Sequence, residues 1–152
     1  MKAIMKNPLF FAFLCFCLCA TCVAPAIGGD ALNVTIEVIR ADPESTVIDP
    51  KLEDLAKELR PVLNYTGFTM VKECKVRLIR DEERTVMLSS GRLLKLHFMG
   101  FEKKEARLIV GIMEKDREIF RTTLLLVDKG NILIGGPAYE TGVLLLRIGA
   151  RF

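Results

Sequence analysis

The chain has 152 residues, the length of one domain, and 51% of them are hydrophobic. Its 22 Lys and Arg residues are interspersed with 19 Asp and Glu residues, so the composition gives no support for binding to nucleic acid or to an anionic membrane. His97 is the only histidine, and Cys74 is the only cysteine after residue 22. This inventory argues against a zinc or copper site and excludes a disulfide bond within residues 27–152.

The first 26 residues have the three parts of a Sec-type signal peptide. Lys2 and Lys6 make the start positive, residues 9–20 form an apolar run, and Ala24 and Ala26 are the small residues that a signal peptidase requires. We therefore predict a signal peptide over residues 1–26 and a single exported domain over residues 27–152. Removal of the signal peptide takes away four of the five cysteines and lowers the formal net charge from +3 to +1.

Two alternatives to cleavage remain open. The uncharged stretch over residues 7–29 is long enough to span a bilayer, which needs about 20 apolar residues, and it would then anchor the domain. A lipoprotein would instead be acylated on Cys22, although the three residues before it depart from the usual pattern. All three interpretations place the domain across the membrane, in the periplasm or outside the cell.

The mature chain begins with a predicted strand and continues into one helix. Apolar and polar residues alternate over 33–39, which indicates the strand. Asp49 is a good N-cap, Pro50 fits the first helical position, and apolar residues recur at positions 52, 55, 56 and 59. We therefore predict an amphipathic helix from Asp49 to Arg60, ended by Pro61.

Everything after the helix has the pattern of strands separated by short turns. In the first of these strands, from Phe68 to Ile79, the pattern places Phe68, Met70, Cys74, Val76 and Leu78 on one face. Further strands are predicted over 85–88, 94–98, 106–112, 117–127, 132–134 and 143–150. We predict a mainly β (α+β) domain, an antiparallel sheet or sandwich of about eight strands with one amphipathic helix packed on it.

Two of these strands are apolar on both faces, over residues 124–127 and 143–146. Such strands are typical of the centre of a sheet that is covered on both sides. We expect both to be central, with the helix on one side and a second sheet or a partner on the other.

The sequence shows no catalytic arrangement, and we predict no catalytic residue, metal site or cofactor. His97 lies on a strand beside apolar neighbours, and the acidic pairs fall at the helix start or in turns, where water solvates them. The segment from Gly135 to Pro137 lacks the spacing and the lysine of a phosphate-binding loop, and we interpret it as a turn or a bulge. Tyr65 and Tyr139 flank turns; they either close the ends of a β-sandwich or serve as candidate interaction residues.

Two segments carry a resemblance to known proteins. The segment IDPKLEDLAKELRPVLNYTGFTMV, residues 48–71, resembles exported bacterial proteins of unknown function in which an Asp-Pro-x-Leu helix precedes a β-domain. The tail over residues 128–148 resembles their closing hairpin, with Gly-Gly-Pro before an apolar last strand. The resemblance implies a shared fold and a bacterial envelope setting, but no reaction. Residues 130–136 are also similar to a hairpin of outer-membrane secretins, although the chain is too short for a secretin core.

Three classes of function follow from these observations. The leading hypothesis is a non-catalytic exported envelope protein that binds another envelope protein or itself, as an accessory of a secretion or surface-assembly system. The alternative is a periplasmic carrier of a lipid or small apolar ligand, with the two-sided strands lining a cavity. A secreted hydrolase is the third class and would need two carboxylates facing one cleft.

Overall fold

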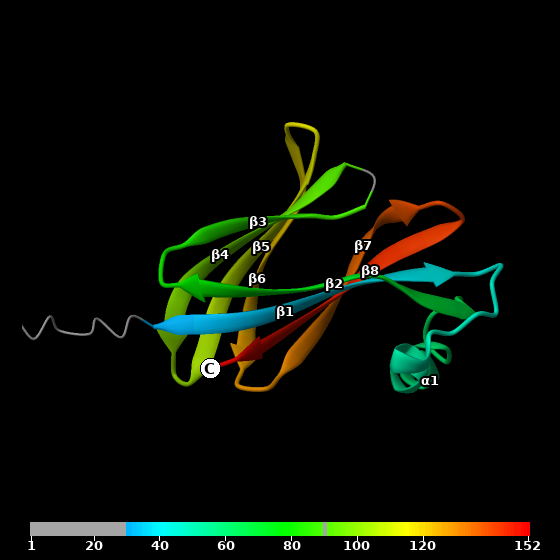
Figure 1. Cartoon of the computed structure of the whole chain (residues 1–152), viewed down its shortest axis with the longest axis horizontal. Helices are drawn as coiled ribbons and strands as arrows, with labels where there is room; N and C mark the ends of the chain where they lie inside the picture. Colours follow the sequence, from blue (N-terminus) through cyan, green and yellow to red (C-terminus); the bar gives the residue numbers. More distant parts are fainter. Residues whose placement is uncertain (1–29, 90) are drawn as a thin grey trace, which may run out of the picture.

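The computed structural model describes residues 30–89 and 91–152, which form two four-stranded antiparallel sheets packed face to face with a short helix outside (Figure 1). The strands are β1 (Ala31–Asp42), β2 (Gly67–Ile79), β3 (Glu83–Met87), β4 (Arg92–Glu102), β5 (Glu105–Glu114), β6 (Arg117–Val127), β7 (Asn131–Tyr139) and β8 (Gly142–Arg151). A 3-10 turn (Pro50–Leu52) and α1 (Glu53–Leu59) lie between β1 and β2. The structure confirms the predicted fold class. The predicted signal peptide, with Ala24 and Ala26, lies outside the described residues.

The eight strands divide into a sheet A with the order β2-β1-β8-β7 and a sheet B with the order β3-β4-β5-β6. Sheet B is a meander whose tight turns place Lys103, Lys104 and Lys115 at positive φ. In sheet A, the first and last strands pair at the centre, from Asn33 opposite Arg151 to Ala41 opposite Val143. The centre of sheet A is therefore built from strands that lie far apart in the sequence.

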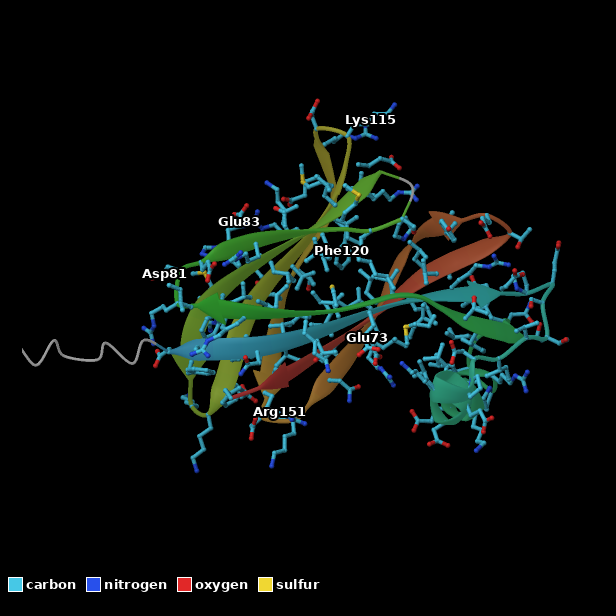
Figure 2. All side chains as sticks on the ribbon, in the orientation of Figure 1. Glu73, Asp81, Glu83, Lys115, Phe120 and Arg151 are labelled. Carbon is cyan, nitrogen blue, oxygen red and sulfur yellow. The ribbon has the colours of Figure 1, made fainter. Side chains whose placement is uncertain are left out.

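Alternate residues of both sheets form one inter-sheet core. Ile36 of β1, Phe98 of β4 and Leu108 of β5 are fully buried there, and burial of one side chain of this size contributes about 1.5–3 kcal/mol. Phe120 of β6 packs against the margin of this core, between the two layers (Figure 2). Side chains thus fill the space between the sheets.

The helix covers one end of the outer face of sheet A, at the right of Figure 1. Its apolar residues Leu52, Leu55 and Ala56 are buried against Ile39 and Phe68 of the sheet. The predicted stripe is therefore the buried face of the helix, and we call this group the helix-side cluster. Among residues 30–89 and 91–152, no helix is long and apolar enough to cross a bilayer.

The start of the helix differs from the prediction by one turn. Asp49 caps it as expected, since its Oδ1 accepts a hydrogen bond of 3.0 Å from the Lys51 N–H. The Leu52 N–H then bonds to the Asp49 carbonyl at 2.8 Å, which closes a 3-10 turn. The α-helix proper therefore begins at Glu53 rather than Pro50 and ends at Leu59.

A β-bulge in β2 corrects the prediction that its apolar residues share one face. The pairing of β2 with β1 shifts register between Val38 and Ile39, opposite Val71, and the extra residue turns the following side chains to the other side of the sheet. Phe68 and Met70 consequently pack in the helix-side cluster, whereas the other three predicted residues contact the inter-sheet core: Cys74, Val76 and Leu78.

The expectation for the two-sided apolar strands is right for β8 and wrong for β6. In β8, Leu144 and Leu146 belong to the inter-sheet core and Leu145 to the helix-side cluster, so both faces are covered. Strand β6 is the edge of sheet B, and its outward residues Leu125 and Val127 remain 48% and 52% exposed. Apolar composition alone did not distinguish an edge strand from a central one.

Candidate functional site

The outer face of sheet A is only half covered by α1, and the other half carries an open trough. The trough has a volume of about 730 Å³ and crosses all four strands of the sheet. Its floor contains Thr35 of β1 and Gly149 of β8, which lie opposite each other in the register. We call this feature the cationic trough, because five basic side chains line it: Lys75, Arg77, Lys129, Arg147 and Arg151.

Gly149 accounts for the depth of the trough at its centre. Paired strands normally place a row of outward-facing side chains across a sheet. Here the row consists of Lys75, Thr35, Gly149 and Asn131, and Gly149 has no side chain to fill its position. A Cβ built at Gly149 would meet its nearest neighbour, the Gly130 carbonyl oxygen, at 3.7 Å, which is ordinary van der Waals contact. Backbone packing therefore does not require glycine here.

One of the five basic side chains of the cationic trough forms an ion pair within residues 30–89 and 91–152. Arg147 binds Glu37 across the β1–β8 pair in a half-buried ion pair. This hydrogen bond with Glu37 is the main cause that raises the pKa of Arg147, and the nearby carboxylates of Glu58 and Glu73 add to it. The remaining cations take part in none of the ion pairs formed within residues 30–89 and 91–152: Lys75, Arg77, Lys129 and Arg151.

Comparison with known proteins does not identify the chain. No family model, no curated protein and no solved structure matches it. The candidate site therefore has to be interpreted from its own geometry and chemistry.

The two tyrosines predicted as candidate interaction residues do not form a common surface. Tyr65 packs against the helix-side cluster, and Tyr139 packs against the inter-sheet core. Each is half-buried, and the other role considered for them, closure of the ends of the sandwich, stays a prediction. Neither residue lines the cationic trough.

His97 lies on the outer face of sheet B and is half-buried. It borders a second, much smaller hollow of about 70 Å³, whose lining also includes Gly111, Glu118 and Arg121. Arg121 and Glu118 approach each other to 3.4 Å. Within the described part of the chain, no group of three His, Cys, Asp or Glu residues is placed to hold a metal ion.

Cys74 and the segment from Gly135 to Pro137 both lie within the β-sandwich and outside the lining of the cationic trough. Cys74 is half-buried against the inter-sheet core, and desolvation raises the pKa of its thiol. The segment from Gly135 to Pro137 interrupts the pairing of β7 with β8, where the register shifts between Gly135 and Ala138. The interpretation of this segment as a bulge is therefore confirmed.

One buried charge was not predicted. Asp42 is 4% exposed, and its carboxylate accepts hydrogen bonds from the Glu44 N–H at 2.9 Å, from Arg40 and from the Thr141 hydroxyl. The bond from the Glu44 N–H and then that from Arg40 are the largest causes that lower the pKa of Asp42 to about 2. Arg40 also binds Glu140, so this network ties the end of β1 to the β7–β8 hairpin.

Sequence reasoning missed the cationic trough because its cations come from separate segments. Positions 75 and 77 alternate along β2, and positions 147, 149 and 151 alternate along β8. This period of two is visible in the sequence and places each set on one face. Nothing in the sequence shows that β1 brings the two sets onto the same face of one sheet.

Proposed function

We propose that the protein is a non-catalytic envelope protein, exported to the periplasm or the cell surface, that binds another protein as an accessory of a secretion or surface-assembly system. The observation that carries the proposal is the open trough on the uncovered half of sheet A. The strands beneath it are held by hydrogen bonds on both sides at β1 and β8, so the trough is a preformed surface. Preformed surfaces bind with a small entropic cost.

The residues of the trough favour binding over catalysis. Among the residues that the structure describes, no histidine, cysteine or serine lines the trough, and the carboxylate of Glu37 is already engaged by Arg147. Asn33, Thr35 and Asn131 offer hydrogen-bonding groups between the cations. Polar groups of this kind, placed around a hollow, provide specificity and orientation to a bound partner.

The packing gives less support to the carrier of apolar ligands considered above. A carrier would need space between its sheets, and there the inter-sheet core is formed by buried side chains from both layers. The cationic trough on sheet A is lined mainly by polar side chains and opens to the outside. Native mass spectrometry of the gently purified protein tests the carrier directly, since a co-purified lipid would favour it over a protein binder.

The proposed function is tested by capture of a partner from bacterial envelope extracts with the full chain. Gly149→Val adds a side chain to the lining of the trough at a position where a Cβ makes only ordinary contacts, and Gly111→Val makes the matched change in the hollow of sheet B. We expect the wild type and Gly111→Val to retain the same partner and Gly149→Val to lose it. A partner retained equally by all three proteins, or a wild-type monomer without any partner, would overturn the proposal.

A further inference from the structure

The charges of the cationic trough are polarised along the strands. Near α1, Arg147 is paired with Glu37, and the carboxylates of Glu58 and Glu73 are close enough to act on its charge. Toward the far end, past Gly149, the charged side chains that line the trough are the cations Arg77, Lys129 and Arg151. In Figure 2, Glu73 lies on the side of the helix and Arg151 near the opposite end of the sheet. A ligand in the trough would therefore experience a potential that is more positive at the far end.

Two rows of residues define the cationic end. Arg77, Asn33 and Arg151 lie side by side on β2, β1 and β8. In the next row, Lys75 and Thr35 lie beside Gly149. Neighbouring strands lie about 5 Å apart and every second residue about 7 Å further along, so the two arginines begin roughly 10 Å from each other with an amide between them.

We propose that the cationic end of the trough binds carboxylate side chains of an acidic, extended segment of the partner protein. This inference rests on the proposed function and names the chemistry of the partner. Arginine presents a planar fork of donors that matches a carboxylate in a bidentate geometry, and lysine adds a mobile point charge. Arg77 and Arg151 are the principal binding residues. Lys75 and Lys129 also line the cationic trough, beside Gly149.

The lining of the trough favours a peptide over a nucleic acid. Proteins that bind single-stranded nucleic acids combine a basic groove with aromatic side chains on which the bases stack. Within residues 30–89 and 91–152, no phenylalanine, tyrosine or tryptophan lines the trough. An extended peptide needs no such platform, because its backbone can lie over the small floor residues Thr35 and Gly149 while its carboxylates reach the cations.

The polarity also gives the bound segment a direction. Acidic side chains are attracted to the row of Arg77 and Arg151, whereas at the other end the cations Arg147 and Lys51 are already paired with Glu37 and Glu73. We expect the acidic side chains to cluster in one half of the segment and neutral or basic ones to lie toward α1. Because the cations are exposed, the affinity should fall as salt screens them.

The experiment measures binding of a fluorescently labelled hexaglutamate peptide to the full-length protein by fluorescence anisotropy, with hexaglutamine as the neutral control probe. We expect hexaglutamate alone to bind, and more weakly at an ionic strength of about 0.15 M than at about 0.01 M. The double variant Arg77→Gln/Arg151→Gln should weaken binding by roughly two- to thirtyfold. Lys104→Gln/Lys115→Gln removes the same charge at exposed turns of sheet B and should bind as the wild type does.

Each failure points to a different conclusion. Equal binding of the two peptides, or equal loss in both double variants, would overturn the acidic-segment inference. Tighter binding of a hexathymidine oligonucleotide than of hexaglutamate would overturn the choice of a peptide. If Gly149→Val abolishes partner capture while hexaglutamate does not bind, the inference fails and the proposed function stands. If Gly149→Val captures the partner normally, the proposed function fails whatever the peptide does.

Discussion

The hydroxyl of Thr141 donates a hydrogen bond of 2.9 Å to the Asp42 carboxylate, joining residues 99 positions apart in the sequence. Asp42 ends β1, and Thr141 lies in the turn between β7 and β8. Asp42 also accepts bonds from the Glu44 N–H and from Arg40. Two of these donors lie only two residues from Asp42 in the sequence, whereas the Thr141 hydroxyl is brought to the carboxylate by the fold.

This network predicts a loss of stability in acid. The pKa of Asp42 falls from 3.8 to about 2 on folding, so the folded state favours the ionised form. The contribution is fully present above the unfolded pKa near 4 and disappears as the pH falls toward 2. Asp42→Asn should lower the urea midpoint at pH 7 and lose less stability than the wild type between pH 4 and pH 2. Equal losses over that range would show that Asp42 is not responsible, and Glu44→Gln is the control.

Close backbone contact at Gly142 predicts a large effect of one methyl group. A Cβ at this position would lie 1.9 Å from the Ala41 carbonyl oxygen, so β1 and β8 would have to separate. Gly142→Ala should lower the free energy of unfolding by about 3 kcal/mol or prevent folding. Gly135→Ala is the matched control, since its Cβ would meet nothing within 4 Å. Urea denaturation distinguishes the two, and similar midpoints would contradict the close contact.

The central and edge positions of the two-sided strands predict different costs for the same substitution. Leu145 is 4% exposed beneath α1, whereas Leu125 is 48% exposed at the edge of sheet B. Leu145→Ala should cost about 2–5 kcal/mol through lost burial and a cavity, and Leu125→Ala about 0.5 kcal/mol or less. The two free energies of unfolding are measured by chemical denaturation. A cost at Leu125 as large as at Leu145 would mean that another surface covers β6.

Because Val71 is the extra residue of the β2 bulge, we expect its deletion to destabilise the protein more than the loss of its side chain. Deletion of Val71 would bring Phe68 and Met70 into the regular alternation of β2 and turn them away from the helix-side cluster. We expect a loss of more than about 3 kcal/mol in unfolding free energy. Val71→Ala keeps the backbone and removes a side chain that is 37% exposed, so it should be nearly neutral. Differential scanning calorimetry of the two variants provides the comparison.

Local patterns predicted most of the elements correctly, because they record which side of a strand or helix is buried. The stripe of the helix and the alternation of β1 and β5 are examples, and Asp49 caps the helix as expected. The predictions that Phe68 shares a face with Cys74 and that the strand of Leu125 is central were wrong for a common reason. A bulge and a strand's neighbours depend on pairing with distant segments, and the period of one strand carries no information about them.

The sequence by itself determined the strands, the capped helix and a nearly even balance of charge. The tertiary structure decided where those charges meet. Arg77 and Arg151 lie 74 positions apart in the chain and face the same side of sheet A only because both β2 and β8 pair with β1. Antiparallel pairing aligns outward-facing residues into rows, and α1 covers only one end of them. A chain whose charges are interspersed in sequence thereby acquires a cationic trough on one face.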